Sequence, residues 1–282
     1  MIESLMKYEF LQNAFITGLL IGLIAPILGV FIVVRKQALI ADALSHITLG
    51  GIAFSLLLGK FWSSFSTLNP VYGGMVFSVT GSLLIEKLRS VYKHYEELAI
   101  PIIMSFGIGL SVIFISMADG FTTDLFGYLF GSVSAVSRVD LLIVLGISMM
   151  VIVTIFFLYK GLFLLSFDEE HGRTMGLPSK TINFIFIVTV ALVIAISMRI
   201  VGILLVSSLM TLPVASSIRI AKSFKQMIFL SVLFGEIAVI GGLISAYYLD
   251  LAPGGTIVVI AAFILLLVIL YKNVQYKFQS GR

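Results

Sequence analysis

Residues 10–34 read FLQNAFITGLLIGLIAPILGVFIVV, a stretch without a charged side chain between Glu9 and Arg35. A helix needs about 20 apolar residues to cross the hydrocarbon core of a bilayer. At about 1.5 Å per residue, this stretch is long enough to cross. The sequence therefore contains at least one predicted membrane span, and this span sets the pattern for the rest of the chain.

The same pattern recurs along the chain. Further stretches without Lys, Arg, Asp or Glu, apart from Glu236, are residues 43–59, 61–85, 98–118, 141–159, 181–198, 200–218, 226–249 and 251–271. Each has a length suited to a membrane helix, although the shortest could dip into the bilayer instead of crossing it. The predicted fold class is all-α, a polytopic transmembrane bundle of about eight to nine spans.

Composition excludes several classes of protein. The chain is 60% hydrophobic and 11% charged, against roughly a quarter charged in soluble proteins. A net charge of +4 is too small and too scattered for a nucleic-acid binder. The absence of cysteine excludes disulfides, iron–sulfur clusters and thiolate zinc sites. No HExxH, GxSxG or Walker A motif occurs, so we expect no enzyme activity and no ATP site. We expect a single membrane domain over residues 1–282, surrounded by lipid.

One apolar stretch is too short to cross. Residues 125–137, LFGYLFGSVSAVS, contain two glycines and three serines. A helix of this length reaches only about 20 Å, which favours a re-entrant half-helix covered by other helices. A surface hairpin is the alternative.

The basic residues indicate the orientation. We place the N-terminus outside, without a cleaved signal peptide because Glu3 and Glu9 stand where a basic region would be. The inner loops then carry Arg35, Lys36, Lys87, Arg89, Lys93, Lys160, Arg173, Lys180, Arg219, Lys222, Lys225, Lys272, Lys277 and Arg282, and the outer ones only Lys7, Lys60, Arg138 and Arg199.

Asp42 and His46 are the candidate metal ligands. An acid in a membrane span costs about 2.5–3.5 kcal/mol and needs compensation. The i, i+4 spacing puts the carboxylate and the imidazole on one face of a helix, a donor pair that suits a divalent transition metal. Two copies in a symmetric dimer would supply two of each ligand. Alternatively, Asp42 pairs with Arg35 or Lys36 while His46 binds a carbonyl.

Other polar residues within spans are candidates for lining a pathway. Glu236 either lines the path or pairs with Arg199 or Arg219. The stretch around Pro213 carries Ser207, Ser208, Thr211, Ser216 and Ser217. Proline frees a backbone carbonyl that neighbouring hydroxyls can satisfy, so Ser208 and Thr211 are candidate pathway residues. The same small residues also suit ordinary helix packing.

The longest polar inner segment is SFDEEHGRTMGLPSK, residues 166–180. Ser166 is the expected N-cap, Asp168, Glu169 and Glu170 suit a first turn, and Gly176 before Pro178 is a stop signal. We expect a short cytoplasmic docking helix over residues 166–176; an inert connecting helix is the alternative.

Three stretches are distinctive: ILGVFIVVRKQALIADALSHITLGGIA (27–53), LLSFDEEHGRTMGLP (164–178) and VGILLVSSLMTLPVASSIRI (201–220). They resemble the permease subunits of bacterial ATP-binding-cassette importers for zinc, manganese and iron(II). LFGSVSAVS and DLAPGGTIVV are also similar, so the resemblance covers nearly the whole chain.

The resemblance implies a type II importer-like homodimer in the bacterial plasma membrane, two ATPase subunits inside, and a metal-binding lipoprotein or periplasmic protein outside. By matching position, Asp42 and His46 would be metal ligands, and residues 167–176, including Phe167, the coupling helix. LRSVYKHYEE looks more like zinc permeases of low-GC Gram-positive bacteria than manganese ones. We therefore expect Zn²⁺ import, with Mn²⁺ or Fe²⁺ as alternatives and no permanently bound cofactor.

The expected mechanism is alternating access driven by the partner ATPase. A secondary divalent-cation transporter is one rival, although it would need more intramembrane carboxylates than Asp42 and Glu236. An intramembrane metal-dependent enzyme is another, for which two ligands and no evident base are poor support.

Overall fold

The computed structural model describes residues 7–62, 65, 67–92, 94–118, 120, 123–132 and 136–280. These residues form helices and turns and contain no strand. The helices are α2 (Glu9–Val34), α3 (Leu39–Phe61), α5 (Pro70–Val91), η1 (Glu96–Leu98), α6 (Ala99–Met117), α7 (Thr123–Phe130), α8 (Arg138–Phe167), α9 (Glu169–Thr174), α10 (Ser179–Val201), α11 (Ile203–Ile220), α12 (Phe224–Leu249) and α13 (Pro253–Ser280).

Every predicted span corresponds to a long helix. In the described residues, seven helices are long and apolar enough to cross a membrane: α2, α3, α6 with η1, α8, α10, α12 and α13. The other two long helices are α5 and α11. α5 is the more polar because Glu86, Lys87 and Arg89 fall inside it. The all-helical membrane fold is thus confirmed.

Several helix boundaries differ from the charge-free stretches. α5 starts at Pro70, nine residues into its stretch, because proline fits the first turn and Asn69 caps the helix by accepting a hydrogen bond from Val71 N at 3.1 Å. α3 starts at Leu39, so Asp42 lies in its first turn. α10 and α11 are separated only by Gly202, whose φ of 84° favours glycine.

The predicted half-helix is confirmed in part. α7 covers Thr123–Phe130, so it starts before the predicted stretch and ends inside it. It packs against α10, α11 and α13, as a short segment at membrane depth requires. Residues 133–135, Lys93 and Arg282 lie outside the described residues.

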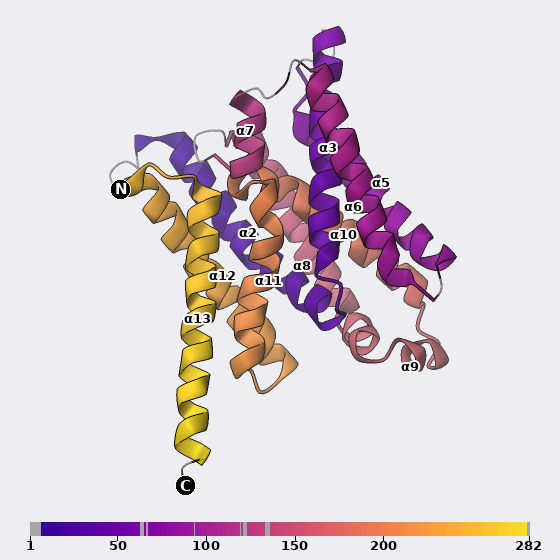
Figure 1. Cartoon of the computed structure of the whole chain (residues 1–282), viewed down its shortest axis with the longest axis vertical. Coiled ribbons are helices and arrows are strands. Elements are labelled where there is room, and N and C mark those ends of the chain that lie inside the picture. Colours follow the sequence, from indigo (N-terminus) through magenta and orange to yellow (C-terminus); the bar gives the residue numbers. More distant parts are fainter. Residues whose placement is uncertain are drawn as a thin grey trace.

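Most of the long helices form two groups, and α8 packs against α2 and α10. α3, α5 and α6 pack together, and α2, α11, α12 and α13 form the other group (Figure 1). α10 contacts both groups, and α11 also packs against α3. Close glycine contacts define the second group: a Cβ on Gly29 of α2 would lie 2.0 Å from Met210 O of α11, so only glycine fits there.

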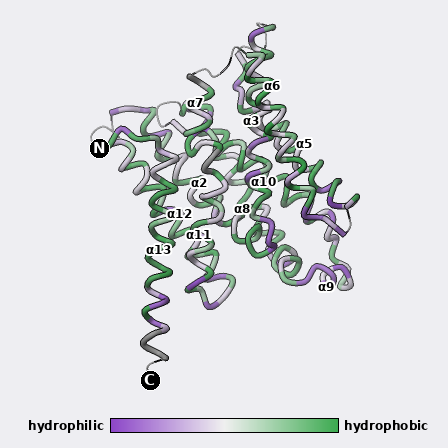
Figure 2. Tube along the Cα trace, in the orientation of Figure 1, coloured by the Kyte–Doolittle hydropathy of each residue, from purple (hydrophilic) through white to green (hydrophobic). Residues whose placement is uncertain are grey.

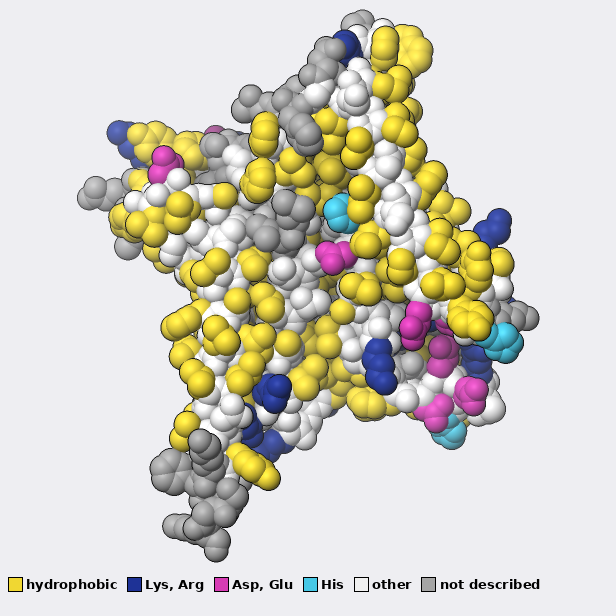
Figure 3. All heavy atoms as spheres, in the orientation of Figure 1, with side chains coloured by type: hydrophobic (Ala, Val, Ile, Leu, Met, Phe, Trp, Pro, Cys, Tyr) yellow, Lys and Arg dark blue, Asp and Glu magenta, His cyan; other side chains and the backbone are white. Residues whose placement is uncertain are grey.

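Many of the charged residues gather at one end of the bundle. Figure 2 shows hydrophobic colouring along most of the long helices and polar colouring over α9 and the lower end of α5. Figure 3 shows basic and acidic side chains clustered at that same end. Arg35, Arg89, Arg173 and Lys180 line one cavity there, which agrees with placing these four residues on one side of the membrane.

Candidate metal site

α3 exposes its two candidate ligands and buries their neighbours. Between Ile40 and Ala53 every residue is buried except Asp42 and His46, which are half-buried. The i, i+4 spacing puts both on the same face of the helix. The pair therefore faces a side of this part of α3 that the described residues leave open.

Close contacts with α5 and α6 fix the position of this face. A Cβ on Gly51 would lie 2.4 Å from Gly73 O of α5, and one on Gly107 of α6 would lie 2.9 Å from Ile47 N. Ser111 of α6 donates a hydrogen bond to His46 O at 2.9 Å. Small residues allow such close backbone approach in membrane helices, so the backbone that carries the imidazole is held firmly.

The alternative structural role for Asp42 is not supported. Within the part of the chain that the structure describes, Asp42 forms no ion pair, and Arg35 is turned toward α8 and α10. No group of three or more His, Asp or Glu side chains there could hold a metal ion. One chain thus offers an oxygen and a nitrogen ligand at this position and needs further ligands from elsewhere.

The hydroxyls of α11 divide into two sets. Ser208 and Thr211 are half-buried, whereas Ser207, Ser216 and Ser217 are buried. Ser217 and Ser231 of α12 share a 2.7 Å hydrogen bond, which is a packing contact between helices. Thr211 donates to Ser207 O at 2.9 Å instead of to the carbonyl of Leu209 that Pro213 frees. Ser208 and Thr211 remain the more accessible of the candidates.

Glu236 does not pair with either predicted arginine. Arg199 binds Asp140 instead, with Nη1 and Oδ1 2.7 Å apart, and Arg219 makes no ion pair with Glu236 in the described ranges. Glu236 lies against α2, where a Cβ on Gly22 would be 3.3 Å from its Oε1. The pairing alternative was wrong because Asp140, at the start of α8, packs beside the end of α10.

The Asp140 cluster escaped the sequence reasoning. Asp140 Oδ1 accepts from Arg199 and, at 2.8 Å, from Asn69 Nδ2. Its other oxygen accepts from Ser137 N at 2.9 Å and completes the capping box of α8. The Arg199 guanidinium also lies over the ring of Tyr128 in α7, 5.9 Å from its centroid. The cluster therefore joins α5, α7, α8 and α10 at the end of α8 opposite α9.

The predicted docking helix is shorter than expected. α9 spans Glu169–Thr174 and is capped by Asp168, whose carboxylate accepts from His171 N at 2.8 Å. Ser166 and Phe167 belong to α8 instead. The N-cap prediction of Ser166 was wrong because α8 runs through it to Phe167. Gly176 follows the helix with φ 81°, as the predicted stop requires.

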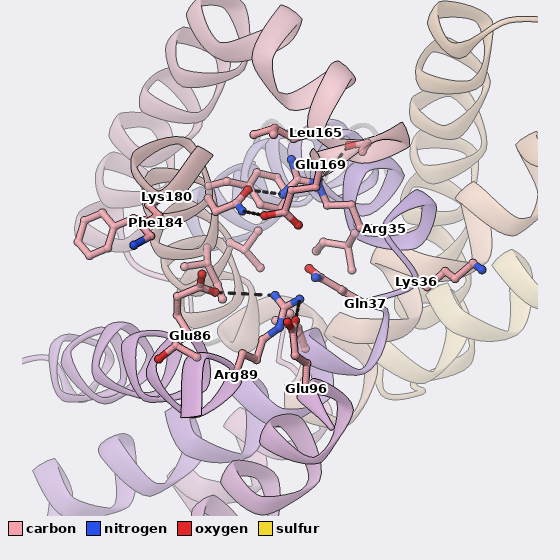
Figure 4. Close-up of a pocket in the computed structure, with 18 of the residues that line it drawn as sticks. Arg35, Lys36, Gln37, Glu86, Arg89, Glu96, Leu165, Glu169, Lys180 and Phe184 are labelled. Carbon is pink, nitrogen blue, oxygen red and sulfur yellow. Dashed lines mark hydrogen bonds and ion pairs between the residues drawn. The ribbon is translucent and has the colours of Figure 1, made fainter. Parts of the chain in front are cut away.

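A cavity of about 830 Å³ lies beside α9. In Figure 4, Arg35 and Glu169 lie on one side of it and Glu86, Arg89 and Glu96 on the other, with Gln37 between them. Burial lowers the pKa of the Arg35 guanidinium to about 10, although Glu169 opposes this shift. Arg35 therefore stays protonated at neutral pH, as a partly buried cation held by its partners.

Comparisons with known proteins agree with this architecture. The model of the ABC 3 transport family matches residues 7–272. The "Probable metal transport system membrane protein" of Treponema pallidum is 35% identical over 96% of this chain and 98% of the relative. The manganese import system permease protein ScaB of Streptococcus gordonii is 34% identical over 94% and 92%, respectively. The solved structure of PsaBC from Streptococcus pneumoniae in complex with Fab superposes with a TM-score of 0.82, at 34% identity and covering 95% of this chain and 93% of that one.

The matched ranges take in all three distinctive stretches of the sequence, including the α2–α3 turn, α9 and α11. The family match also covers six of the seven apolar helices in full and the seventh, α13, up to residue 272. The chain therefore belongs to the ABC 3 transport family, as a multi-pass plasma-membrane permease homologous to the membrane subunits of metal ABC transporters.

Proposed function

We propose that this permease imports a divalent transition metal through a path that uses Asp42 and His46. The observation that carries the proposal is the pattern of burial on α3, where only these two residues between Ile40 and Ala53 remain open. Asp42 forms no ion pair within the described residues, so its carboxylate lies in an apolar membrane helix without a compensating cation, which is costly. A passing cation would compensate for that cost.

The incomplete ligand set supports a homodimer. Each chain supplies one carboxylate and one imidazole, and a two-fold axis beside α3 would bring two of each together. Such a shell would form only while the path holds a metal ion, and it would be weak enough to release it. The half-buried Ser208 and Thr211 lie on α11, which packs against α3, so they are candidates for lining the same path.

The metal that we now favour is Mn²⁺, with Zn²⁺ as the second candidate. An aspartate with a histidine accepts either ion, since carboxylate oxygen suits manganese and imidazole suits zinc. The relative from Streptococcus gordonii is named a manganese import permease, whereas the segment LRSVYKHYEE, residues 88–97, resembles zinc permeases. Selectivity would then rest largely with the extracellular metal-binding protein.

ATP hydrolysis by a partner drives the transport cycle in this proposal. α9 presents Glu169, Glu170 and Arg173 at the charged end of the bundle, where a cytoplasmic ATPase would dock. Movement of α9 would open the path alternately to each side. Residues 1–282 form one permease domain in this proposal.

Uptake in proteoliposomes tests the proposal. The permease, its ATPase and its metal-binding protein are reconstituted, and ATP-dependent Mn²⁺ and Zn²⁺ uptake is measured. Asp42→Ala and His46→Ala should abolish uptake while the complex still assembles. Ser45→Ala is the matched control, because Ser45 lies between them but is buried and bonds to Ala41 O of its own helix. Normal uptake by both variants would reject the site, and uptake without nucleotide would favour a secondary transporter.

A further inference from the structure

We propose that Arg35 is the positioning residue through which α9 controls the start of α3, and with it Asp42 and His46. This inference rests on the proposed function, because it assigns α9 as the docking helix and α3 as the metal-binding helix. Arg35 is the residue that follows α2, and only Lys36, Gln37 and Ala38 separate it from α3.

Arg35 ties this turn to two other helices. Its Nε donates to Ser166 Oγ of α8 at 3.1 Å, and its Nη2 donates to Leu162 O at 3.3 Å. Its Nη1 donates to Asn183 Oδ1 of α10 at 2.9 Å. The guanidinium also lies 5.0 Å from the ring centroid of Phe186. All three nitrogens of the Arg35 guanidinium donate hydrogen bonds in different directions, and its flat face lies over an aromatic ring. Arginine can make this set of contacts and lysine cannot.

A short relay continues from Arg35 to α9. Asn183 Nδ2 donates to Glu169 Oε1 at 3.5 Å, so one amide bridges the guanidinium and the carboxylate. Glu169 Oε1 also accepts from Arg173 Nη2 at 2.8 Å, one turn further along α9. Figure 4 shows Arg35 and Glu169 turned toward the same side of the cavity. A displacement of α9 therefore pulls on Asn183 and Arg35 before it reaches any other part of the turn.

The other side of the turn is anchored to α5. The amide oxygen of Gln37 is directed at Arg89 and accepts hydrogen bonds from Arg89 Nη1 at 2.9 Å and Arg89 Nη2 at 3.0 Å. Arg89 is held in turn by Glu96, 3.0 Å away. Lys36, between the two anchors, adopts φ 58°, a left-handed conformation that non-glycine residues rarely take. The turn is thus clamped between α8, which precedes α9, and α5, which packs on α3.

These contacts form a mechanical link to the metal ligands. Asp42 lies in the first turn of α3, directly after the clamped segment. The remaining part of α3 packs against α5 and α6, so a shift of the turn moves the first turn of the helix most easily. Leaving a partly buried guanidinium without its acceptors is energetically costly. Arg35 therefore moves together with its partners instead of separating from them.

The experiment measures metal moved per ATP hydrolysed by the complete reconstituted transporter. Arg35→Gln removes the diverging donors, and Asn183→Leu removes the amide that bridges Arg35 and Glu169 while keeping the packing volume. Both should still assemble, bind Mn²⁺ and hydrolyse ATP, but Mn²⁺ transported per ATP should fall about fivefold or more. Arg35→Lys keeps the charge and should restore the ratio only in part.

Lys180→Gln is the matched control, since Lys180 lines the same cavity but makes no hydrogen bond or ion pair within the described residues. It should keep the wild-type ratio. A wild-type ratio in Asn183→Leu and in any assembled Arg35→Gln complex would overturn the inference, as would an equal loss in Lys180→Gln. If wild type itself moves no metal, or Asp42→Ala moves it normally, the proposed function has failed instead.

Discussion

Replacing Asp140 by alanine should destabilise the permease far more than removing any exposed ion pair. The side chain of Asp140 is 7% exposed and that of its partner Arg199 is 25% exposed. Removing one member of a buried pair costs about 3–5 kcal/mol because the other charge stays uncompensated. The partial exposure of Arg199 puts this effect near 3 kcal/mol, and loss of the capping box of α8 adds about 1 kcal/mol.

The assay is reversible unfolding in mixed micelles, followed by far-ultraviolet circular dichroism. Arg138→Gln is the control, since its ion pair with Glu9 joins side chains that are 76% and 53% exposed and should contribute at most about 1 kcal/mol. The double variant Asp140→Leu with Arg199→Met should recover part of the loss by removing both charges. A loss in Asp140→Ala no larger than in Arg138→Gln would refute the reasoning.

Three further outcomes are expected. Gly29→Ala would place a Cβ 2.0 Å from Met210 O and should lower the free energy of unfolding by at least about 1–3 kcal/mol in the same assay. The control Gly109→Ala, with nothing within 4 Å of the new Cβ, should be neutral. Equal effects of the two substitutions would contradict the α2–α11 contact. Asp168→Ala removes the cap of α9 and should destabilise that helix by about 1 kcal/mol. The stimulation of ATP hydrolysis by metal should therefore fall. Unchanged stimulation would argue against docking by α9. Because burial lowers the pKa of Arg35 to about 10, the charge on Arg35 costs stability at neutral pH, and this cost declines as pH rises through about 10. The difference in metal moved per ATP between wild type and Arg35→Gln should therefore stay constant from about pH 6 to 8. A change in that difference across this pH range would contradict the assigned charge of Arg35.

The spans could be predicted because the charge-free stretches reflect the solvent. Each stretch contains too many apolar residues for a soluble chain, and each corresponds to a helix. The ends were less certain, since helix signals compete locally. Ser166 and Asp168 are both good N-caps, and only the continuation of α8 through Phe167 decides between them.

The pairing of charges could not be predicted from the sequence. Arg199 and Asp140 belong to different spans, and their contact depends on how α8 packs beside α10. The same is true of Arg35, whose acceptors Ser166 and Asn183 lie more than a hundred residues away. Asp42 and His46 stand out in the sequence as a candidate pair because their spacing is local, and the structure adds that both remain open on α3.

Pulsed electron paramagnetic resonance of Mn²⁺ bound to the purified transporter tests the central claim most directly. Coordination by His46 predicts echo modulation from a directly bound imidazole nitrogen. This modulation should disappear in His46→Ala and persist in His171→Ala, whose histidine lies in α9. Modulation that is absent from the wild type, or that survives in His46→Ala, would contradict the account.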